Sequence, residues 1–184
     1  MHDAPSIAYL HPISIYDAVE VAAMPERARY VVAYVDGVYA NREKLKQRFP
    51  DAEQITMSVI GEKPAQAYDV ENGALTMDDV ASFIRVDHAA GYHRPVVYVS
   101  VGLMPLLVER LSRSGILRST YRVWTAHWTG ESHICGAQCG LAGLEPPGAT
   151  QWHGPSLLNE FDTSVTTLGW WNAVKHDWNA SKLS

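Results

Sequence analysis

AQAYDVENGALTMDDVASFIRVDHAAGYHRPVVYVS, residues 65–100, places a helical segment between two apolar, β-branched runs. The first run, AQAYDVE, and the last, RPVVYVS, are largely continuous rather than alternating, as expected for strands buried on both faces of a parallel sheet. The segment between them, 76–92, begins at Thr76, a suitable N-cap residue, carries acids in its first turn and ends at Gly91. This stretch therefore predicts a strand–helix–strand unit.

The same alternation continues on both sides of this unit. Helical spacing recurs at 41–49 and at 102–116, where Pro105 lies near the start and Gly115 at the end. Strand-like runs occupy residues 13–19, 30–37, 54–61, 65–71, 94–100, 121–128, 148–154 and 159–165.

This order of elements predicts an α/β protein with a single barrel domain over residues 1–184. A complete TIM-type barrel needs about 250 residues, and the later helices are short or missing in this chain. We therefore expect a trimmed (β/α)8 TIM-type barrel. An open doubly wound sheet is the structural alternative.

The composition is that of an ordinary folded protein. Hydrophobic residues make up 47% and charged residues 19% of the chain, which argues against disorder. A formal net charge of −5 does not suit nucleic acid, and no apolar run reaches the roughly 20 residues that span a bilayer. We see no signal peptide. We expect the protein to act outside the cell or in a virion, which would require another delivery route.

Acidic residues recur at or near the ends of the strand-like runs. They are Asp17, Asp36, Asp69 with Glu71, and Asp162. In a (β/α) barrel the C-terminal ends of the strands surround the active site. Asp69 and Glu71 are two residues apart and so share one side of a strand. Any single acid also has a structural interpretation, such as capping a helix, and Asp36 precedes a glycine in a plain turn signal.

Several carboxyl groups at one mouth suit glycoside hydrolysis. A carboxyl that is partly desolvated and close to other carboxylates has a raised pKa and can stay protonated as a general acid. A second carboxylate can then stabilise or attack the oxocarbenium-like centre.

The ordered motifs IYDAV, AYDVE, RPVVYVS, VWTAHW, ATQWHG and NEFDTSV resemble those of the family 25 glycoside hydrolases, the Chalaropsis-type lysozymes of bacteria and phages. The resemblance covers roughly residues 13–170. A weaker resemblance connects the segment HWTGESHICGAQCG with glycoside-hydrolase-like domains of actinobacteria and their phages.

The resemblance implies cleavage of the β-1,4 bond between N-acetylmuramic acid and N-acetylglucosamine in peptidoglycan, without a cofactor or metal. Glu71 would be the proton donor, Asp69 the stabiliser, and Asp17 and Asp162 the rest of an acidic floor. The substrate-binding residues would be Asp36, Tyr98, Trp124 and Trp152.

Two other functions are compatible with the sequence. The run TMSVIGE, in the third strand, lacks the aromatic residues that the family brings to its cleft. A non-catalytic glycan-binding or virion-associated structural module on the same fold is therefore the main alternative. An intracellular hydrolase of another glycan is the third.

The segment HICGAQC, residues 133–139, holds both cysteines of the chain. We favour a disulfide between Cys135 and Cys139, which would suit a protein that acts outside the cell. Free thiols are one alternative. The other is a zinc site that adds His127 and His133, although the spacing matches no standard zinc signature.

The C-terminal segment GWWNAVKHDWNASKLS, residues 169–184, contains three tryptophans. We expect Trp170 and Trp171 to pack under the barrel or against a neighbouring subunit. An exposed aromatic patch for self-association or a virion partner is the alternative.

Overall fold

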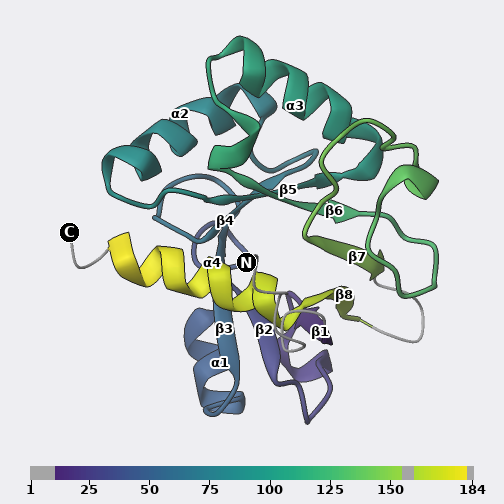
Figure 1. The fold of residues 1–184 in the computed structure, drawn as a ribbon. Coiled ribbons are helices and arrows are strands. Elements are labelled where there is room, and N and C mark those ends of the chain that lie inside the picture. Colours follow the sequence, from purple (N-terminus) through teal and green to yellow (C-terminus); the bar gives the residue numbers. More distant parts are fainter. Residues whose placement is uncertain (1–10, 155–159, 182–184) are drawn as a thin grey trace, which may run out of the picture.

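The computed structural model describes residues 11–154 and 160–181 and contains a closed eight-stranded barrel (Figure 1). Its strands follow one another around the barrel in sequence order, and β8 closes it against β1. The strands are β1 (Pro12–Asp17), β2 (Tyr30–Tyr34), β3 (Glu53–Ser58), β4 (Ala67–Val70), β5 (Val96–Ser100), β6 (Arg122–Ala126), β7 (Ala149–His153) and β8 (Asp162–Thr167). All eight strand-like runs therefore formed strands.

The sheet is mixed, and the prediction of a trimmed (β/α)8 TIM-type barrel is wrong. Strands β1 to β7 run parallel, whereas β8 runs antiparallel to both β7 and β1. Only residues 154–161 connect β7 to β8. A parallel crossover needs a dozen residues or more, so the short connection favours a last strand that turns back. The closed barrel also rules out the open doubly wound sheet.

Helices cover only part of the barrel, which is the second departure from a TIM barrel. The described residues form four α-helices: α1 (Arg42–Arg48), α2 (Met77–Ala89), α3 (Met104–Arg113) and α4 (Leu168–Ser181). Short 3-10 helices add η2 (Val21–Ala23), η3 (Val101–Leu103), η4 (Arg118–Thr120) and η5 (Ala137–Cys139). The connections between β3 and β4 and between β6 and β7 contain no α-helix. None of the four helices has the length and apolar character to cross a membrane.

The three predicted helices lie outside the barrel wall. Figure 1 shows α2 and α3 side by side, and their buried faces share one apolar cluster with β4, β5 and β6. Helix α2 begins as expected, because the Thr76 hydroxyl donates to the Asp79 carboxylate at 2.6 Å and the Thr76 backbone N–H donates to the same oxygen. Helix α1 covers a smaller cluster beside β2.

Helix α4 covers the end of the barrel at which the parallel strands begin. Trp171 is fully buried in the same cluster as Ile15, Val32 and Ile55. Its indole N–H donates to Glu53, the first residue of β3, at 3.0 Å. The expectation that Trp171 packs under the barrel is therefore confirmed.

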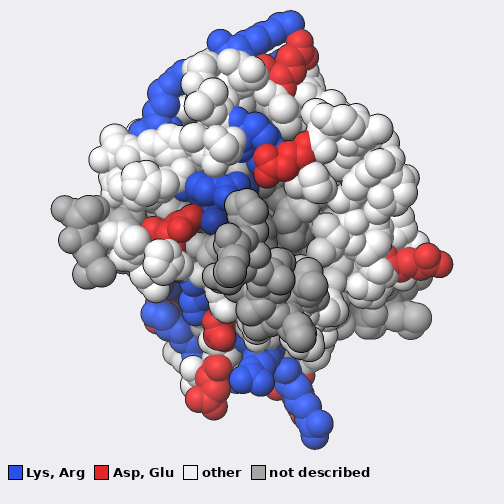
Figure 2. Space-filling view, viewed as in Figure 1, with Lys and Arg blue, Asp and Glu red and all other residues white. Residues whose placement is uncertain are grey.

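Charged side chains surround this end of the molecule. Lys175 of α4 pairs with Glu53 at 3.2 Å, and Asp177 of α4 pairs with Arg122, the first residue of β6, at 2.8 Å. On the face drawn in Figure 2, basic and acidic side chains lie interspersed. These pairs fix α4 across the strands that it covers.

Candidate functional site

The four predicted catalytic acids meet in one cavity at the opposite end of the barrel. Asp17 ends β1, Asp69 lies in β4, and Glu71 is the first residue after β4. The cavity has a volume of about 200 Å³. Its lining consists of Asp17, Tyr34, Met57, Asp69, Glu71, Tyr98, Trp124, Trp128, Gln151 and Asp162.

The reversed direction of β8 brings Asp162 to the same place. The sequence placed Asp162 near the end of a parallel strand, but it is the first residue of β8. Because β8 runs antiparallel, its first residue lies beside the last residue of β1, and Asp17 and Asp162 are register partners. Asp162 thus reaches the mouth through the start of its strand.

Asp17 lies at the floor of the cavity and is 5% exposed. The Tyr34 hydroxyl donates to its carboxylate at 2.6 Å. Burial raises the pKa of Asp17 to about 6, although hydrogen bonds with Tyr34 and Asp162 lower it and the charge of Glu71 raises it. Asp17 is therefore mostly ionised at neutral pH.

Asp162 retains its proton more strongly than Asp17. Burial raises its pKa to about 8, and the charge of Asp17, the hydrogen bond with Asp17 and the charge of Glu71 raise it further, whereas a hydrogen bond with Gln151 lowers it. The two carboxyl groups therefore share one proton at neutral pH, as expected for acids held in contact.

Asp69 is the second acid of the cavity with a high pKa. Burial, followed by the charges of Glu71 and Asp17, raises its pKa to about 7. Its Oδ1 atom is buried and accepts no hydrogen bond from the described residues. Glu71 lies at the exposed rim. The cavity thus combines an ionised acid, two acids that hold protons near neutral pH, and a carboxyl at its entrance.

Gln151 of β7 orients two aromatic side chains at the mouth. Its Oε1 atom accepts hydrogen bonds from the hydroxyl of Tyr98 and, at 2.9 Å, from the indole N–H of Trp128. Tyr98 is buried, whereas Trp128 is 63% exposed. The Trp128 ring is therefore held beside the cavity while most of its surface is accessible.

The predicted substrate-binding residues divide into two groups. Tyr98 and Trp124 line the cavity, but Trp124 is only 1% exposed and forms part of its floor. The Trp124 indole N–H donates to Ser164 at 3.1 Å. Trp152 does not line this cavity, because it follows Gln151 in β7 and successive side chains of a strand point to opposite faces.

Asp36 also lies outside the cavity and has a structural role. Its carboxylate accepts hydrogen bonds from the Ser58 hydroxyl at 2.6 Å and from the Val59 backbone N–H at 2.7 Å. Backbone N–H groups of Ile60, Glu62 and Lys63 also donate to it. Burial alone would raise the pKa of Asp36, but these bonds lower it below its ordinary value. Asp36 thus anchors the connection between β3 and β4.

Sequence reasoning missed four lining residues: Tyr34, Met57, Trp128 and Gln151. Gln151 had a usable signal, since strand alternation allows only one of Gln151 and Trp152 to face the interior. Trp128 follows β6 directly, which is the position from which loops reach the mouth.

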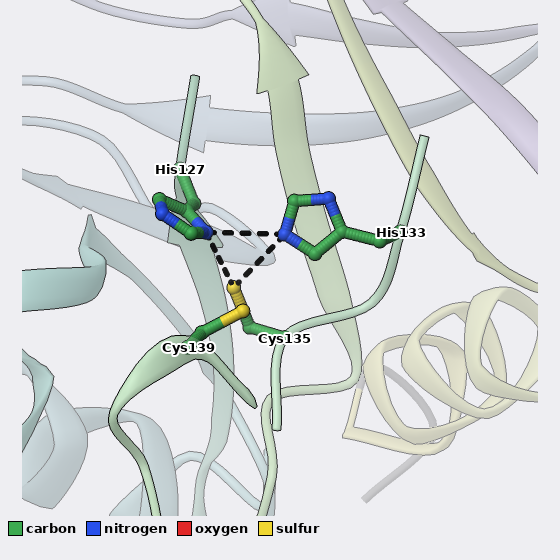
Figure 3. Close-up of side chains that lie close together, drawn as sticks. All are labelled: His127, His133, Cys135 and Cys139. Carbon is green, nitrogen blue, oxygen red and sulfur yellow. Dashed lines mark hydrogen bonds between the residues drawn. The ribbon is translucent and has the colours of Figure 1, made fainter. Parts of the chain in front are cut away.

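A separate cluster of possible metal ligands lies in the connection between β6 and β7 (Figure 3). Figure 3 shows His127, His133, Cys135 and Cys139 converging on one point. Both cysteines are free thiols, so the structure does not contain the disulfide that we favoured. Burial, followed by a hydrogen bond with Cys139, raises the pKa of the Cys135 thiol to about 11, which disfavours a role as a nucleophile.

Comparisons with known proteins identify a similar fold and no family. No protein-family model matches the chain, and no curated protein matches it. A similar solved structure is the 1.07 Å crystal structure of an uncharacterized protein of B. stearothermophilus. It is 11% identical, with a TM-score of 0.51 over 84% of this chain and 95% of that chain. This similarity supports the fold alone, and nothing in the comparisons indicates a hydrolase, a lysozyme or a phage protein.

Proposed function

We propose that this protein hydrolyses a glycosidic bond at the acidic cavity. The observation that carries the proposal is the convergence of Asp17, Asp69, Glu71 and Asp162 on one cavity of about 200 Å³. Glycoside hydrolysis needs a protonated carboxyl at the leaving oxygen and an ionised carboxylate near the anomeric carbon. The raised pKa values of Asp69 and Asp162 beside the ionised Asp17 mean that the cavity holds both protonated and ionised carboxyl groups at neutral pH; the choice of Glu71 as donor comes from the resemblance.

In the proposed reaction, Glu71 donates its proton to the leaving oxygen as the C–O bond breaks. Positive charge then develops on the sugar ring, and the carboxylates of Asp17 and Asp69 stabilise it. Water completes the reaction by adding its hydroxyl to the anomeric carbon and returning a proton to the donor. The resemblance supplies the role of Glu71, and its place at the rim suits contact with an incoming glycan.

Asp69 is the competing candidate for the proton donor. Its pKa of about 7 means that it already holds a proton in about half of the molecules at neutral pH. The two assignments can be distinguished experimentally. Loss of the true donor lowers the rate of hydrolysis much more for substrates with poor leaving groups than for those with good ones.

Peptidoglycan is the proposed substrate, again from the resemblance. The cavity is smaller than the roughly 300–1,000 Å³ of pockets that enclose a whole drug-sized ligand. It would therefore hold a single ring of a glycan whose remainder lies outside. The exposed indole of Trp128 offers an apolar face for the neighbouring sugar.

The first test compares the wild type with Glu71→Gln and Asp69→Asn on purified actinobacterial cell walls. We expect the wild type to reduce the turbidity of the walls and release fragments with new reducing ends, identified by mass. Glu71→Gln should lose at least about 100-fold in rate, since general acid catalysis contributes roughly 10²–10⁴-fold. Glu109→Gln, an exposed change in α3, is the matched control and should keep wild-type activity.

Aryl glycosides with good leaving groups then assign the donor. If Glu71 is the donor, Glu71→Gln should hydrolyse such a substrate far better than a natural linkage, whereas Asp69→Asn should be slow on both. The opposite pattern would assign the donor to Asp69. If the folded wild type binds walls and releases nothing, hydrolysis is refuted and the protein is a glycan-binding module.

A further inference from the structure

We propose that His127, His133, Cys135 and Cys139 bind a single zinc ion with a structural role. The Nδ1 atom of His127 lies 3.1 Å from the Nε2 atom of His133. The Cys135 sulfur lies 3.4 Å from the first nitrogen and 3.6 Å from the second. With the Cys139 sulfur, all four donor atoms lie within 4.8 Å of one another (Figure 3).

These separations are those of the edges of a zinc tetrahedron. Zinc binds nitrogen at about 2.0–2.1 Å and sulfur at about 2.3 Å. A tetrahedral angle then places two nitrogens about 3.4 Å apart and a nitrogen and a sulfur about 3.6 Å apart. The three measured separations agree with these values to within a few tenths of an ångström. An ion could therefore bind His127, His133 and Cys135 with little movement of these side chains, and the Cys139 sulfur lies within 4.8 Å of their donor atoms.

Hydrogen bonds outside the cluster already orient two of the proposed ligands. The Nδ1 atom of His133 lies 2.8 Å from the carbonyl oxygen of Glu131. A carbonyl only accepts, so Nδ1 carries the proton and the Nε2 atom presents its lone pair to the cluster. The backbone N–H of Cys135 donates to the Thr150 hydroxyl of β7 at 2.9 Å, which fixes the first cysteine against the barrel.

The ligand set and its surroundings indicate zinc in a structural role. Two thiolates and two imidazoles favour zinc over magnesium or calcium, which prefer oxygen ligands. Four protein ligands leave no open position for a substrate, which is the arrangement of structural sites. The ligands all belong to residues 127–148, a long connection in which the short η5 is the sole helix. Ordering a long loop without regular structure costs conformational entropy, which the free energy of metal binding would offset.

The proposed metal site adjoins, in the sequence, a residue that lines the acidic cavity. His127 immediately precedes Trp128, and its backbone N–H donates to the Gln151 carbonyl at 2.8 Å. The Gly130 N–H donates to the Trp152 carbonyl at 3.1 Å. A metal bound at His127 and His133 would therefore hold the turn that presents Trp128. The metal site stands independently of the proposed hydrolysis.

The test begins with the metal content of the full chain, purified under reducing conditions with no polyhistidine tag. We expect about one zinc ion per chain by plasma mass spectrometry after extensive dialysis. Cobalt added to the metal-free protein should give the visible bands of tetrahedral Co²⁺ and the near-ultraviolet thiolate-to-cobalt band. These spectra report on the wild type and do not depend on whether any variant folds.

Variants then connect the metal with the four residues. Cys139→Ser and His133→Ala change half-buried side chains and should weaken zinc binding at least about 100-fold, because even neighbours of ligands alter affinity by about 10–100-fold. His93→Ala, at an exposed histidine far along the chain, is the matched control and should bind as the wild type does.

Three results would overturn the proposal. The first is a purified protein without zinc that also gives no cobalt spectrum. The second is zinc that remains equally bound in the Cys139→Ser and His133→Ala variants, which would place it elsewhere. The third is an intact mass that lacks two hydrogen atoms in freshly extracted protein, which would show that Cys135 and Cys139 form a disulfide.

Discussion

At the level of single residues, the main feature of the acidic cavity is that folding raises the pKa of its buried carboxyl groups. Asp17, Asp69 and Asp162 have pKa values of about 6, 7 and 8, against an ordinary value of 3.8. Burial is the main cause for each, and neighbouring carboxylates add to it. Ionising these buried carboxyl groups therefore costs stability, and carboxyl groups perturbed in this way are concentrated at functional sites.

The raised pKa values predict that the protein becomes less stable as pH rises. A carboxyl with a higher pKa in the folded chain stabilises it below the unfolded pKa of about 4, and this contribution is lost as pH rises through the folded value. Between about pH 4 and pH 8 the free energy of unfolding should fall less in Asp69→Asn than in the wild type. The difference should be on the order of 1–4 kcal/mol. Urea denaturation at several pH values measures this change.

Asp78→Asn is the matched control for that experiment, since the Asp78 side chain is 84% exposed. It should retain the wild-type dependence on pH. A curve for Asp69→Asn that parallels the wild type would show that Asp69 titrates alike in the folded and unfolded chains.

At the level of elements, the strand-like runs indicated where strands lie but not, by themselves, which way the last one runs. Continuous β-branched runs mark buried strands whatever their direction. The direction of β8 had a separate signal in the sequence, because the runs at 148–154 and 159–165 leave too few residues between them for a parallel crossover. The four acids could be predicted as a group without that signal, whereas the route by which Asp162 joins them depends on it.

Other elements depended on tertiary contacts that no local pattern encodes. Helix α4 begins with the tryptophan-rich segment around Trp171, and tryptophan has only a moderate helix propensity. Burial of Trp171 against the barrel, rather than local propensity, stabilises α4. Likewise, the aspartate–glycine pair at Asp36 correctly indicates a turn, but its sequence does not reveal that five donors, one from the end of β3 and four from the connection that follows it, surround the carboxylate.

The role of Asp36 gives a prediction for the connection between β3 and β4. Asp36→Ala should destabilise the protein by about 2–4 kcal/mol, because it leaves buried backbone N–H groups without an acceptor. Asp36→Asn should cost less, since its amide oxygen still accepts. Chemical denaturation measures both changes. A fully stable Asp36→Ala that had lost glycan binding would instead support a role in binding substrate.

At the level of the whole molecule, the two ends of the barrel have different chemistry. One end collects acids around a cavity, and the other is covered by α4 with Trp171 buried in the core. Substitutions at one end should therefore mainly affect stability, and substitutions at the other should mainly affect the cavity. Trp171 at the covered end and Trp128 at the cavity allow this comparison.

Trp171→Ala should destabilise the protein by about 3–5 kcal/mol, the usual effect of removing a fully buried large side chain. Trp128→Ala, at the exposed rim of the cavity, should change the free energy of unfolding by less than about 1 kcal/mol. Thermal and urea denaturation followed by far-ultraviolet circular dichroism compare the two. A loss for Trp171→Ala of less than about 1 kcal/mol, as small as that expected for Trp128→Ala, would mean that α4 contributes little to the stability of the barrel.

The reversal of β8 also determines where the chain enters and leaves the barrel. Pro12 and Thr167 are register partners, and the Leu168 N–H donates to the His11 carbonyl at 2.9 Å. Entry and exit therefore lie side by side, at the end remote from the acids. A tether or fusion partner attached through either segment would approach from that side, so immobilised protein would present its open mouth to the surrounding solution.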